Sequence, residues 1–168
     1  MESLWPGRDI GPKIPIGAHS TDIRPNKVMS AHVQKHVLFV DDDPMSRRIV
    51  EKLLRSGIEG VRVTCAGDGA QALDVLDREA VDLLITDLAM PVLDGIELLL
   101  QVARRRLLIP LLVVTGHPSP TTETLVLSAG AIECFEKPIV ADAFLRCVGE
   151  LLFDGQQRAQ LELVSLPC

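Results

Sequence analysis

The feature that most constrains the fold of this chain is an alternation of five short apolar runs with five amphipathic stretches between residues 37 and 153. The first run, residues 37–40, is continuously apolar, which is typical of a strand buried on both faces. The stretch after it repeats Met45, Ile49, Leu53 and Leu54 at helical spacing. Such alternation builds parallel βα units, so the pattern predicts an α/β fold with one five-stranded, doubly wound parallel sheet.

Turn and cap residues place the boundaries of these elements. The expected strands cover residues 37–40, 61–65, 81–86, 111–114 and 132–135. The expected helices cover residues 44–57, 68–78, 95–106, 121–129 and 141–153. Pro118 and Pro120 are expected to deny the fourth helix a regular first turn. Residues 1–35 are rich in proline and glycine and are expected to form a flexible leader before a domain of residues 36–153. Residues 154–168 are a tail whose apolar rhythm is compatible with a longer last helix.

Composition excludes several classes of protein. The 168 residues carry a net charge of −6, and since residues 1–36 are net positive, the rest holds twelve basic against twenty acidic groups. This balance argues against nucleic-acid binding. The longest apolar run, residues 107–114, is too short to cross a membrane, and no secretory signal pattern is present, so a cytoplasmic location is expected. The four cysteines lack metal-ligand spacing and predict free thiols, mostly buried, at residues 65, 134, 147 and 168.

Polar side chains follow four of the five expected strands at the points where those strands end. They are Asp41, Asp42, Asp43, Asp87, Thr115 and Lys137. Because the carboxyl ends of parallel strands meet at one edge of a sheet, these groups are expected to converge. Neighbouring carboxylates need a proton or a divalent cation to neutralise them, and oxygen ligands without histidine or cysteine favour Mg²⁺. With a lysine and a hydroxyl, the set predicts phosphoryl transfer to an aspartate. The alternative is an acidic rim with an unrelated salt bridge to Lys137.

Three aspartates are expected to have structural roles. Asp43 and Asp94 each precede a helix and are predicted to be N-caps. Asp82 begins the third expected strand, at the opposite end of the sheet, and is predicted to be an ordinary solvated residue. The glycines at 67 and 69 are predicted to belong to a turn rather than to a phosphate-binding loop.

Four stretches of the sequence resemble the receiver domain of two-component response regulators. They are residues 37–44 (VLFVDDDP), 82–95 (DLLITDLAMPVLDG), 113–116 (VVTG) and 135–138 (FEKP). Residues 115–117 and 136–138 are most similar to receivers of the nitrogen-regulation type. The resemblance covers residues 36 to about 153 and implies a flavodoxin-like (βα)5 fold with the strand order 2-1-3-4-5. It also implies a cis peptide bond before Pro138.

The resemblance implies a role for each of the acidic residues. Asp87 would be the phosphoacceptor. Asp42 would ligate Mg²⁺ directly, Asp41 would act beside it through water, and Ala89 would offer its backbone carbonyl to the metal.

The same resemblance assigns the switch. Thr115 would bond one phosphoryl oxygen and Lys137 would pair with another. The family usually carries an inward-turning aromatic residue at the position of Cys134, so this chain departs from the pattern there. The neighbouring Phe135 is expected to face the core on the other side of its strand.

The predicted function is that of a single-domain response regulator in a phosphorelay. It would accept a phosphoryl group from a sensor histidine kinase or a histidine phosphotransfer protein. It would signal to a downstream protein by contact through the fourth helix, fifth strand and fifth helix, because the last fifteen residues are too few for a DNA-binding domain. No enzyme activity is expected beyond its own Mg²⁺-dependent phosphorylation and dephosphorylation. The alternatives are a phosphorylation-independent interaction module or a phosphate sink. An aspartate-based phosphatase is disfavoured because Ala89 stands where it would need a second acid.

Overall fold

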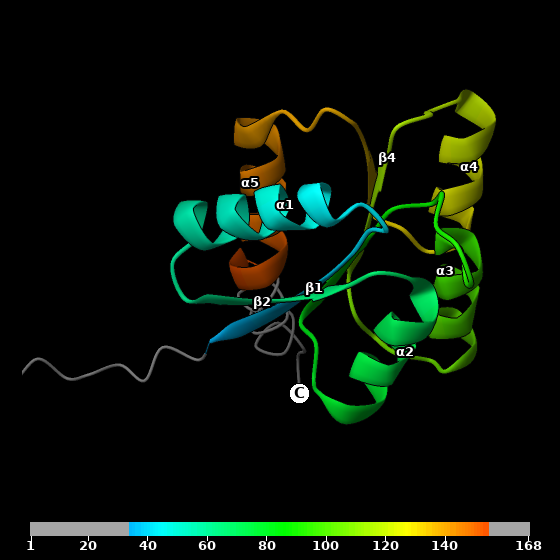
Figure 1. The fold of residues 1–168 in the computed structure, drawn as a ribbon, viewed down its shortest axis with the longest axis horizontal. Helices are drawn as coiled ribbons and strands as arrows, with labels where there is room; N and C mark the ends of the chain where they lie inside the picture. The colour runs from blue at the N-terminus through cyan, green and yellow to red at the C-terminus, as the bar shows by residue number, and fades with distance from the viewer. Residues whose placement is uncertain (1–33, 155–168) are drawn as a thin grey trace, which may run out of the picture. The chain divides into compact units, whose positions relative to one another are not determined.

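Strands and helices alternate from Lys35 to Asp154 in the computed structural model, which describes residues 34–154 (Figure 1). The strands are β1 (Lys35–Val40), β2 (Val61–Ala66), β3 (Leu83–Thr86), β4 (Leu111–Thr115) and β5 (Glu133–Glu136). The helices are α1 (Pro44–Gly57), α2 (Gly69–Arg78), α3 (Gly95–Arg104), α4 (Pro120–Ser128), α5 (Ala141–Gly149) and the π-helical continuation η1 (Glu150–Asp154). The predicted leader and tail lie outside the described residues, except for residues 34, 35 and 154.

The five strands form one parallel sheet in the order β2-β1-β3-β4-β5. This order confirms the predicted α/β class and the doubly wound, flavodoxin-like arrangement. The strand order reverses between β1 and β3, where Val40 pairs with Thr86. The next residues, Asp41 and Asp87, therefore leave neighbouring strands at the same level of the sheet, which is where parallel α/β folds gather their chemistry.

Two apolar layers cover the sheet, one on each face. Val37 and Phe39 of β1 belong to the layer that contains buried residues of α1 and α5. Leu38 and Val40 belong to the layer that contains buried residues of α2, α3 and α4. Figure 1 shows the same division, with α1 and α5 on one side and α3 and α4 on the other. Burial on both faces explains why residues 37–40 of β1 are continuously apolar instead of alternating.

Side-chain caps begin α1 and α3 as the sequence predicts. Asp43 accepts hydrogen bonds from the backbone N–H groups of Met45 and Ser46, and Asp94 accepts one from Glu97. Asp68 is likewise a cap, so α2 begins one residue later than expected. These caps satisfy amide donors that have no partner inside the helix.

The fourth helix begins more regularly than two nearby prolines suggest. Pro120 occupies its first position, and Ser119 caps it by accepting a hydrogen bond from the backbone N–H of Thr122. Proline at the first position costs no hydrogen bond, because that N–H has no helical partner. The expectation that Pro118 and Pro120 disturb the first turn of this helix was therefore wrong.

Asp82 differs most from its sequence prediction. Its carboxylate accepts hydrogen bonds from Lys35 Nζ at 3.1 Å and from the backbone N–H of His36 at 2.8 Å. The Lys35 side chain is almost fully buried, and a buried ammonium group needs such a partner. Asp82 thus ties β1 to the start of β3. Its side chain is 37% exposed and therefore solvated as predicted, but its ion pair with Lys35 means that it is not the ordinary surface residue that was expected.

The cysteines are less buried than predicted. Cys65, Cys134 and Cys147 are free and half-buried, and Cys168 lies outside the described residues. Burial raises the pKa of all three described thiols. A raised pKa keeps a thiol protonated and unreactive, which agrees with a structural role. Within residues 34–154, every helix is too short or too polar to cross a membrane.

Candidate functional site

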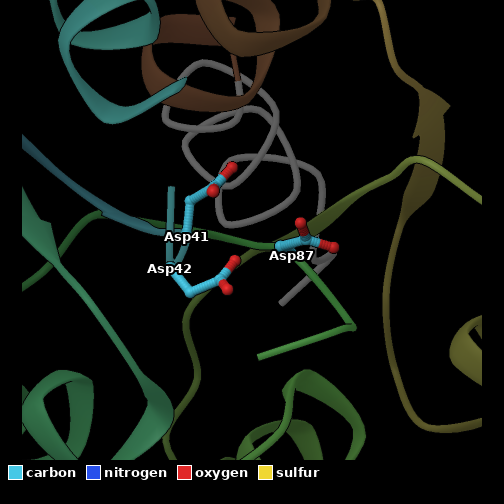
Figure 2. Close-up of side chains that lie close together, drawn as sticks. All are labelled: Asp41, Asp42 and Asp87. Carbon is cyan, nitrogen blue, oxygen red and sulfur yellow. The ribbon is translucent and has the colours of Figure 1, made fainter. Parts of the chain in front are cut away.

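Three carboxylates meet at the carboxyl end of the central strands. Asp41 and Asp42 follow β1, and Asp87 follows β3 (Figure 2). One oxygen from each of them lies within 4.8 Å of the others. Asp41 and Asp87 are buried, whereas Asp42 is exposed. The structure therefore brings together the three acidic residues that the sequence singles out.

Asp41 is fully buried and held from three directions. Its Oδ1 accepts a hydrogen bond from the backbone N–H of Asp43 at 2.9 Å. Its Oδ2 accepts from Ser46 Oγ at 2.6 Å and from Lys137 Nζ at 2.7 Å. A buried carboxylate is tolerated only when its lone pairs are satisfied in this way. Asp41 therefore has one fixed orientation at the base of the site.

The two oxygens of Asp87 have different partners. Oδ1 accepts hydrogen bonds from the backbone N–H groups of Leu88 at 2.5 Å and Ala89 at 3.2 Å. Oδ2 accepts a hydrogen bond from Lys137 Nζ. The backbone N–H of Asp87 also donates to Val40 at 2.8 Å, which ties the residue to the end of β1. Asp87 thus presents a carboxylate of fixed orientation beside a cation.

Lys137 links the two buried carboxylates. Its side chain is 25% exposed, and Nζ bridges Asp41 and Asp87. Partial burial lowers the pKa of Lys137, but hydrogen bonds to the two carboxylates and their negative charges outweigh that effect and raise it. Lys137 is therefore charged at neutral pH. The peptide bond between Lys137 and Pro138 is cis, as the resemblance implies.

Thr115 lies on β4, next to β3, and Cys134 lies on the edge strand β5. Thr115 is buried at the end of β4, and its carbonyl accepts a hydrogen bond from the backbone N–H of Lys137 at 2.9 Å. Cys134 on β5 packs against the layer that contains α4. Phe135 packs on the opposite layer, with its ring 5.3 Å from that of Phe144. The predicted alternation of Cys134 and Phe135 between the two faces is confirmed.

Two residues of α1 belong to the site although sequence analysis did not select them. Ser46 donates to the Asp41 carboxylate, as described above, and Arg47 Nη1 donates to the backbone carbonyls of Asp41 at 2.6 Å and Asp42 at 3.1 Å. Both residues lie in the first turn after the Asp43 cap. Polar residues in the first turn of a helix face the end of the strand that precedes it. This position in the sequence is the signal that could have identified Ser46 and Arg47 as site residues.

Gly95 permits the loop after Asp87 to pack against the start of α3. A Cβ atom at this position would lie 2.0 Å from the carbonyl oxygen of Asp87 and 2.8 Å from Leu88 Cα. The backbone N–H of Gly95 also donates to the Leu88 carbonyl at 3.0 Å. Only glycine allows so close an approach of two backbone segments.

We expect Gly95→Ala to destabilise the protein by about 3 kcal/mol, because the clash is with backbone that cannot rotate away. It should also displace the backbone of Asp87 and so move its carboxylate. The matched control is Gly149→Ala, since a Cβ at Gly149 meets no atom within 4 Å. Denaturant unfolding of both variants measures the effect. Equal stabilities would show that the backbone at Gly95 adapts without cost.

The acidic cluster has the ligand chemistry of a divalent cation site. Among the described residues, these three carboxylates are the one set of three or more potential metal ligands that lie close together. The ligands are all oxygens, which suits hard cations such as Mg²⁺ and disfavours zinc. The cluster already accommodates a positive charge, since Lys137 Nζ contacts Asp41 and Asp87. This acidic pocket is suited to bind a metal ion.

Comparison with known proteins agrees with this geometry. Residues 37–148 match the family described as the response regulator receiver domain. The chain belongs to this family. Its receiver domain is thus of the kind that histidine kinases phosphorylate in two-component signalling.

Among curated relatives, the transcriptional regulatory protein GlrR of Escherichia coli K12 is 34% identical over 122 residues, which are 73% of this chain and 27% of GlrR. The DNA-binding transcriptional regulator NtrC of the same strain is 29% identical over 130 residues, or 77% of this chain and 27% of NtrC. The receiver domain described here thus spans about a quarter of these relatives' length. The match to NtrC agrees with the predicted resemblance to nitrogen-regulation receivers.

A solved structure shows the same fold. The chemotaxis protein CheY4 of Vibrio cholerae is 29% identical, with a TM-score of 0.65, and the match covers 71% of this chain and 99% of that chain. Nearly all of CheY4 is therefore matched by about seven tenths of this chain.

Proposed function

We propose that this receiver domain accepts a phosphoryl group on Asp87 from a phosphohistidine side chain of a sensor histidine kinase or a histidine phosphotransfer protein. A carboxylate oxygen of Asp87 attacks the phosphorus atom, the P–N bond to the donor imidazole breaks, and the imidazole leaves with the electron pair. The observation that carries this proposal is the Asp87 carboxylate, held by backbone amides on one side and by Lys137 on the other.

The surrounding residues would divide the remaining tasks. Asp41, Asp42 and the backbone carbonyl of Ala89 would hold Mg²⁺ together with Asp87, and bound Mg²⁺ would neutralise the negative charge that gathers on the phosphoryl oxygens. Lys137 would pair with one of these oxygens and keep the acceptor carboxylate oriented. After transfer, the hydroxyl of Thr115 would donate to another phosphoryl oxygen.

An apolar groove beside the site supports a protein as the phosphoryl donor. The groove lies between α1 and the loop after β5, and its lining includes Ile49, Leu53, Lys137, Pro138 and Ile139. Ile49 is 59% exposed although it shares the helical spacing of the core residues. Exposed apolar side chains next to a reactive group are typical of an interaction surface. We assign this groove to the histidine-bearing donor.

Intact-mass measurement tests the function. Incubation of the full chain with acetyl phosphate and Mg²⁺ should add the mass of one phosphoryl group, and EDTA should prevent the addition. Acyl phosphates hydrolyse readily in base, so brief alkaline treatment should restore the original mass. Incorporation that is insensitive to EDTA and stable to base would contradict the proposed phosphoacceptor chemistry.

We further propose that Thr115 and Cys134 form the switch, and that α4 carries most of the change. A cysteine fills little of the space that an aromatic residue occupies, so its movement alters the surface only slightly. By contrast, α4 has a single buried residue, Val126, while Leu125 and Leu127 are exposed. A helix anchored by one side chain has low local stability. It is therefore the element best able to move and to contact a downstream protein.

Hydrogen exchange before and after beryllofluoride treatment tests this switch. Protection should change across residues 118–130, with little change around Cys134. A change centred on Cys134 instead would contradict the leading role of α4. Unchanged protection in both regions would favour a phosphate sink that transmits no signal.

A further inference from the structure

The carboxylate of Asp42 is placed differently from the other two. Asp41 and Asp87 each accept three hydrogen bonds, as described above. The Asp42 side chain is exposed, and within residues 34–154 no donor forms a hydrogen bond with its carboxylate. Its position therefore depends on the backbone that carries it. Any group that fixes this backbone also fixes the third oxygen ligand of the proposed metal site.

Arg47 is the side chain that holds this backbone. From α1 its Nη1 donates to two successive carbonyls, those of Asp41 at 2.6 Å and Asp42 at 3.1 Å. The guanidinium group also approaches the end of β2, because a Cβ atom built on Gly67 would lie 3.4 Å from Nη1. Hydrogen bonds from a charged donor are stronger and shorter than neutral ones. Arg47 therefore clamps the turn at which both carboxylates leave β1.

We propose that Arg47 is a positioning residue for the metal site, which sets the affinity for Mg²⁺ by holding the backbone of Asp42. This inference rests on the proposed function, in which Asp42 is a Mg²⁺ ligand. Residues that orient metal ligands without touching the metal commonly contribute about 10- to 100-fold to metal affinity.

The sign of the effect separates positioning from simple electrostatics. Arg47 carries a positive charge close to a cation site, and this charge repels Mg²⁺. If charge were its only influence, removing it would tighten Mg²⁺ binding. If Arg47 positions Asp42, removing it weakens Mg²⁺ binding despite the lost repulsion. The neighbouring Arg48 is exposed and forms no hydrogen bond among the described residues, so its replacement removes the same charge from the next position of α1 without removing a backbone contact.

NMR titration of the full chain with MgCl2 at constant ionic strength gives the Kd for each variant. We expect Arg47→Gln to raise the Kd by about tenfold. Arg47→Lys keeps the positive charge and a single donor nitrogen. Its Kd should therefore lie between those of Arg47→Gln and the wild type. Arg48→Gln should leave the Kd unchanged or lower it slightly. Melting temperatures measured in EDTA show whether each variant is folded at the temperature of the titration. If Arg47→Gln is not folded, Arg47→Lys takes its place in the comparison.

A Kd for Arg47→Gln equal to or below that for Arg48→Gln would overturn the positioning role. Asp42→Asn provides the reference for the proposed function itself. If Asp42→Asn abolishes Mg²⁺ binding while Arg47→Gln behaves like Arg48→Gln, only the role of Arg47 fails. If Asp42→Asn binds Mg²⁺ as the wild type does, the metal site is wrongly assigned. Phosphorylation of Arg47→Gln at saturating Mg²⁺ should recover toward the wild-type rate, since positioning acts on metal affinity.

Discussion

Replacement of Asp87 by asparagine is expected to abolish phosphorylation by acetyl phosphate. An amide oxygen is a far weaker nucleophile than a carboxylate, so the substituted side chain would form no acyl phosphate. The amide has nearly the shape of the carboxylate, and its oxygen can still accept from the backbone N–H groups of Leu88 and Ala89. The fold should therefore persist, and intact-mass measurement should show no added phosphoryl group.

The control for this experiment is Asp82→Asn. Asp82 lies at the opposite end of β3 and pairs with Lys35, so its replacement removes the same charge without touching the site. It should cost some stability, because the buried ammonium of Lys35 loses a charged partner, but labelling should persist. Equal labelling of Asp87→Asn and the wild type would mean that another residue is the phosphoacceptor.

Replacement of Asp42 by asparagine is expected to remove the response to Mg²⁺ and to raise the melting temperature in its absence. The wild-type carboxylate is exposed, lies within 4.8 Å of two others, and accepts no hydrogen bond among the described residues. Removing its charge relieves repulsion and leaves no donor without a partner. An increase of about 2–4 °C in EDTA corresponds to a modest gain in stability.

Melting curves with and without Mg²⁺ measure both effects, because a ligand that binds only the folded state stabilises it by mass action. The matched control is Asp43→Asn, which removes a charge from the same loop while asparagine still caps α1. This control should keep the Mg²⁺ response. If Mg²⁺ raised the melting temperature of Asp42→Asn as much as that of the wild type, Asp42 would be excluded as a ligand.

Interactions along the chain were predictable because they depend on short sequence spacing. The apolar runs predicted β1 to β5 to within about two residues, and the caps at Asp43 and Asp94 followed from the residues just before each helix. Convergence at the strand ends followed from one property of parallel sheets, that successive carboxyl ends lie on one edge. The strand order came from the family resemblance and not from the apolar pattern.

Interactions across the chain were not predictable in this way. The pairing of Lys35 with Asp82 and the clamp of Arg47 on the Asp42 carbonyl depend on where long side chains reach once the elements are packed. The exposure of Met45 and Ile49 depends on which arc of α1 the sheet and α5 cover, a choice that helical spacing leaves open. The sequence by itself determined the order of the elements, their caps and the carboxylates at one edge, because these obey local periodicity. Only the tertiary structure decided which groups hold those carboxylates in place, because hydrogen bonds between distant segments require their positions in space.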